Sequence, residues 1–292
     1  MGKISGLKMD QYRKYHQQTG KAWNVTAEIY ERDEAENLAL LRSGGDRLLP
    51  PEHRFLEGLK AWCKRAIHLQ CAGGTDTLSL WMLGAAEVVG VDISEKMIEV
   101  ARRKSTALDA PARWYCCDIL DTSHEMDNTA DLVYTGKGAL PWMMDIQAWA
   151  GVVTRLLKPG GKLYVFEGHP LDWVWDMDAA AYQFSAQTGN YFTETVATDR
   201  GWPMFSDAIQ EHAHKDQLHV HERQWTLGAI LNSLVAAGLQ LERFEEYPDL
   251  FWNQFPNLPA DLACRLPHTF SLLMRKEQPL ERSKGLSEME VG

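Results

Sequence analysis

The stretch HLQCAGGTDTLSL, residues 68–80, decides the fold that the sequence predicts. An apolar run from Ala66 to Cys71 leads into the adjacent glycines Gly73 and Gly74, and a second apolar pattern begins at Leu78. This layout predicts a strand, a tight turn and the start of a helix. In open parallel sheets, nucleotide-like cofactors bind at such turns. The stretch therefore predicts a ligand site, although it is poorer in glycine than most loops of this kind.

The pattern downstream of this stretch alternates between predicted strands and predicted helices. With the opening strand, strands are expected over 66–71, 88–93, 113–119, 131–136, 162–168, 239–247 and 269–276. Helices are expected over 77–83, 95–108, 145–157 and 226–238. The run VVGVDI has no polar–apolar alternation, which is typical of a strand covered on both faces. We therefore expect an α/β fold with a doubly wound, Rossmann-like seven-stranded sheet, mostly parallel and with an antiparallel last strand.

Three further segments accompany this sheet. Residues 1–60 combine helical patches with a loop rich in glycine and proline, which predicts a helical N-terminal cap before a core at 61–276. The strand–helix rhythm stops at 171–222, which predicts an insertion after the fifth strand. The last segment, 277–292, is polar and poor in large apolar groups, and we expect it to be disordered.

The composition is that of a globular protein with an acidic surface. The 292 residues are 45% hydrophobic and 24% charged, with a formal net charge of −10. An acidic surface repels phosphate backbones, which disfavours nucleic-acid partners. No apolar run approaches the roughly 20 residues that cross a bilayer, and the opening stretch lacks the continuous apolar core expected of a signal peptide. The five cysteines form no C-x-x-C pair, so we expect a reduced, cytoplasmic protein with no membrane partner.

The ends of the second and third predicted strands carry the groups of an adenosine pocket. Asp92 ends the second strand, where a carboxylate can accept two hydrogen bonds from a ribose diol. Asp118 ends the third strand and can accept from an exocyclic adenine amine, while Ile93 and Ile119 enclose the ring. With the first strand end, these groups predict an adenosine-containing ligand.

The glycine pattern distinguishes between two such ligands. A dinucleotide pyrophosphate favours G-x-G-x-x-G, but Ala72, Gly74 and Thr77 occupy these places. Asp76, at the helix start, would also repel a phosphate. S-adenosylmethionine (SAM) has no phosphate and carries cationic ammonium and sulfonium groups, which tolerate an acid. Asp76 either contacts the ligand or only caps the helix.

With these residues in place, the chain resembles the class I SAM-dependent methyltransferases over about residues 66–276. The motifs VVGVDIS, YCCDI and LLKPGG carry this resemblance. More narrowly, HLQC..G.DTLSL..LGA and YTGKGALPWMMDIQAWAGVVTRLLKPGGKLYVFEGHP are similar to a bacterial small-molecule branch of the family. The first motif departs from the common acid and G-x-G-x-G pattern, because Gln70 takes the acid position, Ala72 the first glycine and Asp76 the third.

The resemblance implies where the methionine part of SAM binds. Its methionine and ribose side is expected to lie along four residues of the first turn, which are Gln70, Cys71, Gly73 and Gly74. Thr135 and Gly136, at the end of the fourth strand, are expected to flank the sulfonium.

The resemblance also implies a set of adenosine contacts. Asp92 is expected to hold the ribose hydroxyls. Ile93 and Met97 are expected to lie under the adenine, with Asp118 and Ile119 covering its far edge.

The acceptor side is less well defined by the sequence. His169, at the end of the fifth strand, is the candidate general base, since imidazole titrates near neutral pH. The alternative is that His169 only orients the following turn. Trp23 and Tyr30 in the cap, and Trp173 and Tyr191 in the insertion, are candidates to bind the acceptor. The alternative is that the aromatic insertion only seals itself onto the sheet.

Two H-x-H pairs lie within EHAHKDQLHVHE, residues 211–222. Residues i and i+2 of a strand share a face, so each pair has metal-binding geometry. No acidic ligand pattern accompanies them. We therefore expect a strand with exposed imidazoles rather than a metal site.

The function that these observations predict is methyl transfer from SAM to an oxygen, nitrogen or sulfur atom of a small, partly apolar metabolite, by a monomer or homodimer. An NAD(P)-dependent oxidoreductase is the alternative enzyme class, disfavoured by the missing glycines and by Asp76. A non-catalytic SAM-binding module is a third possibility. A methyltransferase acting on macromolecules is disfavoured by the net charge.

Overall fold

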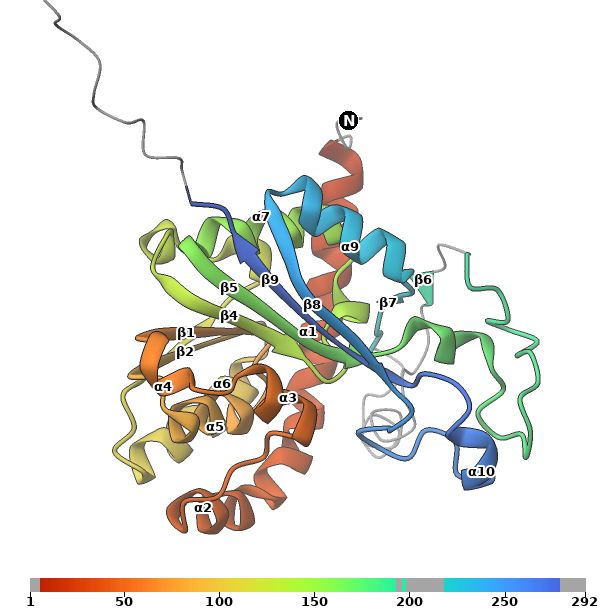
Figure 1. Ribbon diagram of the computed structural model, residues 1–292, viewed down its shortest axis with the longest axis horizontal. Helices are drawn as coiled ribbons and strands as arrows, with labels where there is room; N and C mark the ends of the chain where they lie inside the picture. Colours follow the sequence, from red (N-terminus) through yellow and green to blue (C-terminus); the bar gives the residue numbers. More distant parts are fainter. Residues whose placement is uncertain (1–5, 193–195, 198–217, 279–292) are drawn as a thin grey trace, which may run out of the picture.

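The computed structural model describes residues 6–192, 196–197 and 218–278. These residues build a central sheet with helices on both faces (Figure 1). Its strands are β1 (Arg65–Leu69), β2 (Glu87–Asp92), β3 (Ala112–Cys116), β4 (Ala130–Gly136), β5 (Leu157–Gly168), β8 (Leu239–Tyr247) and β9 (Thr269–Lys276). A separate two-stranded pair is formed by β6 (Val196–Ala197) and β7 (Glu222–Arg223).

The seven strands are arranged in the order β3-β2-β1-β4-β5-β9-β8. The pairs from β3 to β5 are parallel, whereas β9 is antiparallel to both β5 and β8. The predicted seven-stranded, mostly parallel sheet with an antiparallel last strand is therefore confirmed. Because the order reverses between β1 and β4, the carboxyl ends of these strands are where a ligand site is expected.

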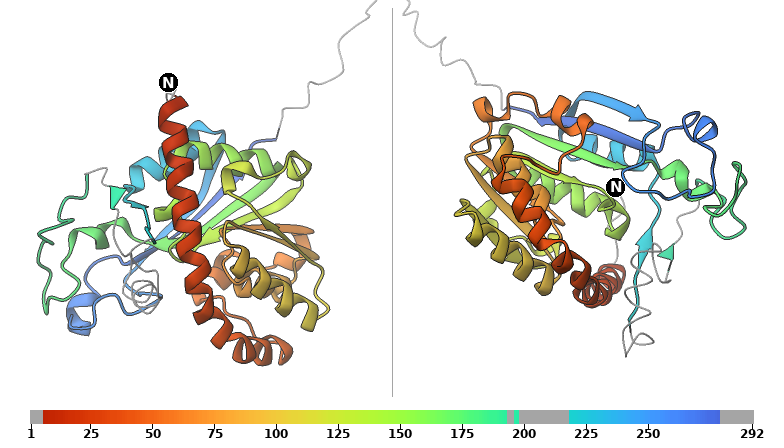
Figure 2. Two further views of the ribbon diagram at one scale, coloured as in Figure 1. Left: turned by 180° about the vertical axis from the view of Figure 1, so that it is seen from behind. Right: turned by 90° about the horizontal axis from the view of Figure 1, so that it is seen from below.

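Helices cover both faces of the sheet. Before β1 come α1 (Gly6–Arg32), α2 (Glu34–Arg42), α3 (Pro50–Phe55) and α4 (Leu59–Trp62). Then follow α5 (Thr75–Leu83), α6 (Glu95–Ala107), α7 (Ile146–Leu156), α9 (Leu227–Ala236) and α10 (Ala260–Ala263). The long helix α1 runs across the carboxyl ends of the strands (Figure 2). The predicted N-terminal cap region thus contributes both α1 at the strand ends and α3 and α4 at the sheet.

Two apolar clusters hold these layers together. One packs α7 and α9 on the sheet and includes the wholly buried Trp149. The other packs α3, α4 and α5 on the opposite face and includes Tyr134 and Tyr164. Burying large side chains of this kind contributes roughly 1.5–3 kcal/mol each to folding. The two clusters fix the strand ends, and with them the positions of the residues that follow each strand.

Parts of the predicted insertion and of the predicted tail lie outside the residues that the structure describes. Of the predicted insertion at 171–222, residues 193–195 and 198–217 lie outside the described part, and so do His212 and His214 of the H-x-H pairs. Of the predicted tail, residues 279–292 also lie outside it. Among the helices that the structure does describe, none has the length and apolar character needed to cross a membrane.

Candidate active site

A cavity of about 380 Å³ lies at the carboxyl ends of the strands and is called the main cavity below. Its volume is in the range typical of small-molecule sites, roughly 300–1,000 Å³. The residues that end successive strands line it in spatial order: Asp118 after β3, Asp92 on β2, Gln70 after β1 and Gly136 on β4. Because neighbouring strands lie about 4.8 Å apart, these four positions form a continuous row. The structure therefore brings the predicted strand-end residues together.

The turn after β1 has a strained backbone. Gln70 and Ala72 adopt left-handed conformations with φ of 58° and 44°, and Gly74 has φ of 76°. A Cβ atom on Gly74 would lie 2.5 Å from the Trp114 ring, so only glycine fits there. Left-handed non-glycine residues cost about 1–2 kcal/mol each and are concentrated at functional sites. Cys71, Gly73 and Gly74 also line the main cavity.

Gln70 offers an unpaired acceptor at this turn. Its Nε2 atom donates to the carbonyl of Ala139 at 2.7 Å. Its Oε1 atom is buried and has no hydrogen-bond partner in the described part of the chain. Buried polar atoms are almost always paired, so an orphaned oxygen at a cavity wall fits a ligand that donates a hydrogen bond.

Asp92 is 8% exposed and is held by the turn that it faces. Its Oδ2 accepts from the backbone N–H of Ala72 and its Oδ1 from that of Ser94, both at 2.8 Å. Burial raises the pKa of Asp92 to about 6, against the effect of these N–H groups. Each carboxylate oxygen retains a second lone pair, so the group can still accept hydrogen bonds from a ligand.

The helix α1 forms a wall beside the ends of β2 and β3. Gly20 lets the helix approach Ile93, because a Cβ atom there would lie 3.2 Å from the isoleucine side chain. His16, Ile93, Asp118 and Ile119 all line the main cavity. Burial alone would raise the pKa of Asp118, but its hydrogen bond with His16 outweighs this and holds the pKa below its usual value.

Two aromatic residues of α1 also line the main cavity. Trp23 packs edge-on against Trp142 at 5.4 Å between ring centroids. The Tyr30 ring lies 3.2 Å from the position that a Cβ atom on Gly73 would take. Both residues were candidates for the acceptor side, and the structure places Tyr30 beside the turn that follows β1.

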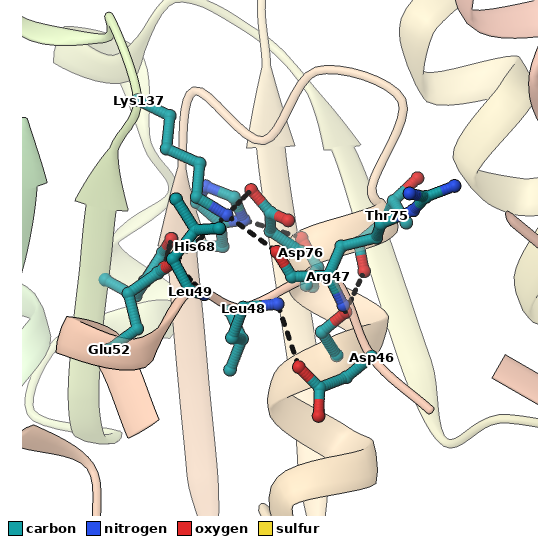
Figure 3. Close-up of polar contacts among 12 residues, drawn as sticks. Asp46, Arg47, Leu48, Leu49, Glu52, His68, Thr75, Asp76 and Lys137 are labelled. Carbon is teal, nitrogen blue, oxygen red and sulfur yellow. Dashed lines mark hydrogen bonds and ion pairs between the residues drawn. The ribbon is translucent and has the colours of Figure 1, made fainter. Parts of the chain in front are cut away.

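A charged cluster closes the cavity wall at the N-terminal end of α5 (Figure 3). The Lys137 ammonium lies 3.0 Å from Asp76 Oδ2 and 3.1 Å from Glu52 Oε2, and it donates to the carbonyl of Arg47 at 3.1 Å. Glu52 is 0% exposed and also accepts a hydrogen bond from the Tyr134 hydroxyl. The N-cap of α5 is Gly74, so Asp76 is not the N-cap residue, which was one of the two roles that the sequence left open. Asp76 instead lines the cavity in the first turn and pairs with Lys137.

The pKa values within this cluster follow from burial and pairing. Burial alone would lower the pKa of Lys137, but Asp76 and Glu52 raise it above its ordinary value. Burial raises the pKa of Glu52, against the attraction of Lys137. The neighbouring His68 ring bonds Thr77 Oγ1 at 2.8 Å, and burial lowers its pKa to about 4. His68 is therefore neutral at physiological pH.

His169 lies apart from the main cavity. It lines a second cavity of about 20 Å³, called the side cavity below. Its Nδ1 accepts from the backbone N–H of Leu171 at 3.1 Å, and its Nε2 lies 2.9 Å from Glu246 Oε1. Burial lowers the pKa of His169, against the effect of Glu246. Both ring nitrogens are therefore already paired, Nδ1 with the turn at Pro170 and Nε2 with Glu246 of β8.

Four other candidates do not line the main cavity. Thr135 is buried and donates to the carbonyl of Leu69 at 3.2 Å. Met97 is buried in α6. Trp173 lines the side cavity, and the Tyr191 hydroxyl accepts from the N–H of Leu227 at 3.0 Å, at the start of α9.

Sequence reasoning missed the cavity residues after β4 and between β8 and β9. Lys137, Gly138, Trp142, Phe251 and Trp252 all line the main cavity. The aromatic pair in PDLFWNQFPNLP, residues 248–259, is a usable signal, because large apolar side chains in a polar connection need a surface to cover.

Glu167, at the end of β5, fixes the loop after β4. Its carboxylate accepts from the backbone N–H groups of Gly138, Ala139 and Leu140, and from that of Gly168. Burial raises the pKa of Glu167, although these four donors oppose the rise. The carboxylate thus sets the position of the loop that carries Lys137 and Gly138 to the cavity.

Comparisons with known proteins show what this chain is similar to. The family model of a methyltransferase domain matches residues 66–161. A ubiquinone biosynthesis O-methyltransferase of Chromobacterium violaceum is 27% identical over 164 residues, which cover 56% of this chain and 63% of that protein. A demethylmenaquinone methyltransferase of Thermus thermophilus is 32% identical over 122 residues, covering 37% of this chain and 54% of that protein. The chain thus spans less than two thirds of the length of these two relatives.

A solved structure extends the likeness to the fold. The SAM-dependent methyltransferase from Mesorhizobium loti has a TM-score of 0.55 at 24% identity, covering 77% of this chain and 96% of that chain. The family match and the methyltransferase names of these relatives support a class I SAM-dependent methyltransferase, as the motifs of the chain predict. SAM is the cofactor of this family, so the chain is grouped with methyltransferases rather than with the NAD(P)-dependent oxidoreductases that were the alternative.

Proposed function

We propose that this chain binds SAM in the main cavity and transfers its methyl group to an oxygen, nitrogen or sulfur atom of a small molecule. The observation that carries the proposal is the row of strand-end groups along one cavity, with the orphaned Gln70 Oε1 at its centre. That oxygen suits a donor such as the SAM ammonium group. A phosphate, which only accepts hydrogen bonds, leaves it unpaired.

The residues present fit each part of the cofactor. Asp92 would accept from the ribose hydroxyls, and Ile93 and Ile119 would enclose the adenine. Asp118 would accept from the adenine amine at the wall that His16 completes. Asp33 and Asp76 also line the cavity and suit cationic groups. These assignments rest on the strand order and on the lining of the cavity.

When bound, SAM supplies an electrophilic methyl group on a sulfonium. The chain would hold the acceptor in line with that methyl group and exclude water, and such positioning alone can account for much of the rate. Trp23, Trp142 and Trp252 give the cavity walls that exclude water. Burial keeps the His68 imidazole neutral, and the Asp76 carboxylate forms an ion pair with Lys137. The contacts of His169 favour the orienting role over the general-base role.

The acceptor is proposed to be a small molecule. The names of the two relatives, which concern ubiquinone and demethylmenaquinone, support this class. The net charge of −10 argues against nucleic-acid substrates. We extend the proposal to a protein that works as a monomer or homodimer in the cytoplasm, as the sequence predicts.

The test is calorimetry with SAM and with its product S-adenosylhomocysteine (SAH), followed by a metabolite screen for SAH formation. We expect both cofactors to bind at micromolar concentrations and at least one small molecule to be methylated. Binding of NADH without response to SAM or SAH would overturn the proposal. If SAM binds but no acceptor in a broad screen is methylated, the non-catalytic SAM-binding module becomes the better description.

A further inference from the structure

The connection between β8 and β9 brings Phe251 and Trp252 to the main cavity. In the sheet order, Asp118 follows the edge strand β3, whereas β8 is the strand at the opposite edge. Adenosine contacts and this connection therefore lie at opposite ends of the row of strands. The region between them, beyond Gly136, is the part of the cavity left for an acceptor.

Trp252 is fixed in place by its neighbours, although it is 39% exposed. A Cβ atom on Gly138 would lie 3.1 Å from its ring, and Gly138 has φ of 92°, so glycine gives the indole room against the loop after β4. Phe251 packs edge-on against Trp252 at 4.4 Å between centroids, with an interplanar angle of 87°. The two rings form a corner that presents aromatic faces in two directions.

A hydrogen-bond chain also orients the indole. With its amide turned so that both ends are satisfied, Gln254 accepts from Trp252 Nε1 at 2.8 Å and donates to Asp172 Oδ2 at 3.1 Å. Asp172 is buried, and its Oδ1 lies 2.7 Å from Nδ1 of the buried His268. Trp252 is therefore held in place through Gln254 by Asp172 in the turn after β5, and Asp172 is in turn held by His268 just before β9.

Trp252 separates the two cavities. Gly138, Phe251 and Trp252 line both of them. On the far side of this wall, the carboxylates of Glu167 and Asp172 are already paired with backbone N–H groups and with His268. The wall formed by Phe251 and Trp252 thus offers aromatic surface rather than an uncompensated charge. Which acceptor molecules bind there would depend on their shape and on their flat ring faces.

We propose that Trp252 is the specificity-determining residue of the acceptor site and that it selects flat, unsaturated rings over saturated rings of the same size. Aromatic faces favour offset or edge-on partners, which a flat ring supplies and a puckered ring does not. The inference rests on the proposed function, because the acceptor region is defined as the part of the cavity that SAM leaves free.

The test measures binding of phenol and of cyclohexanol to the full chain saturated with SAH, by calorimetry and ligand-observed NMR. Phenol is expected to bind about tenfold more tightly than cyclohexanol. Trp252→Leu keeps an apolar side chain without a ring and is expected to abolish this preference, whereas Trp252→Phe retains most of it. Phe184→Ala, which removes an exposed ring outside both cavities, is the control and leaves the preference unchanged.

The outcomes separate this inference from the proposed function. If the wild-type chain does not bind SAH, the proposed function fails. If SAH binds but phenol does not bind more tightly than cyclohexanol, or the preference persists in Trp252→Leu, only the role of Trp252 is overturned. SAH affinity is expected to stay within twofold in all variants, and its loss in a Trp252→Leu protein with unchanged thermal unfolding would place Trp252 in the cofactor site and overturn the inference.

Discussion

The Nδ1 atom of His16 lies 2.7 Å from the Oδ2 atom of Asp118, which joins α1 to the end of β3. The backbone N–H of Met144 donates to Nε2 of the same ring at 3.1 Å. Because Nε2 accepts, Nδ1 carries the ring proton and donates it to the carboxylate. One imidazole thus connects α1, the end of β3 and the loop before α7 at the cavity wall.

His16→Ala is expected to reduce the free energy of unfolding by about 2 kcal/mol at pH 7, because a buried carboxylate loses a hydrogen-bond donor. His16 holds the pKa of Asp118 below its usual value, although burial opposes this. A carboxyl group whose pKa is lowered in the folded protein stabilises the fold at pH values above its usual pKa range. This stability is lost as the pH falls through the pKa of the folded state. Urea unfolding at several pH values should show the gap to wild type shrinking on acidification. An equal loss in His53→Ala, an exposed histidine beside Asp46, would contradict a special role for the buried pair.

Asp92 links cofactor affinity to pH. Burial raises the pKa of Asp92 to about 6, because it disfavours the ionised carboxylate in the ligand-free fold. Protonated Asp92 therefore contributes stability that is fully present below the usual carboxyl pKa range and is lost as the pH rises through about 6. The ionised form is the better acceptor for ribose hydroxyls, so SAH affinity should rise between pH 5 and 7. Asp92→Ala is expected to weaken SAH binding by about 1–3 kcal/mol and to remove this pH dependence. Calorimetry across that range measures both effects, with the exposed Asp109→Asn as the control. Unchanged affinity in Asp92→Ala would mean that Asp92 does not contact the ribose.

The sequence predicts the sheet well because its signals are local. Apolar runs, turn glycines and the cap at Ser94 each depend on a few neighbouring residues, and Asp92 and Asp118 follow directly from the ends of their strands. The wall formed by α1 was not predictable in this way. The His16–Asp118 contact spans 102 residues and the Lys137–Asp76 contact 61, and packing alone decides which side chains meet over such separations. The same reason explains why Phe251 and Trp252 were missed.

Lys137→Met would leave Glu52 and Asp76 together without their shared cation. We expect the free energy of unfolding to fall by about 3–5 kcal/mol, because breaking a buried ion pair leaves an uncompensated charge. Burial raises the pKa of Glu52, so the stability that its protonated form contributes is lost as the pH rises through this raised pKa. The variant should therefore be more strongly destabilised at pH 8 than at pH 5.5 in urea unfolding.

Two further variants separate this effect from a general loss of lysine. Glu52→Gln combined with Lys137→Met removes one of the two carboxylates and should recover part of the stability. Lys96→Met, at an exposed pair with Glu99, should leave unfolding unchanged. Additive losses in the double variant would show that Glu52 and Lys137 are not energetically coupled.

Glu167→Gln should loosen the loop after β4. The amide group puts a donor where the carboxylate accepts backbone N–H groups, which costs about 1–3 kcal/mol for groups left unpaired. We expect faster hydrogen exchange at Gly138, Ala139 and Leu140 than in wild type, measured by mass spectrometry. Glu125→Gln, on the exposed surface, is the control. Equal exchange in both variants would mean that the carboxylate does not hold the loop.

Gly136→Ala and Gly151→Ala are expected to change stability in opposite directions. A Cβ atom on Gly136 would lie 2.1 Å from the carbonyl oxygen of Phe166 in β5, so the paired strands would have to separate. We expect a loss of about 3 kcal/mol, because overpacking against backbone cannot be relieved by a side-chain rotation. Gly151 lies on the exposed side of α7 with nothing within 4 Å of its Cβ position, and alanine there should add about 0.5–1 kcal/mol through helix propensity. Thermal and urea unfolding of both variants test this, and a tolerated Gly136→Ala would show that β4 and β5 can separate at the cavity without loss of the fold.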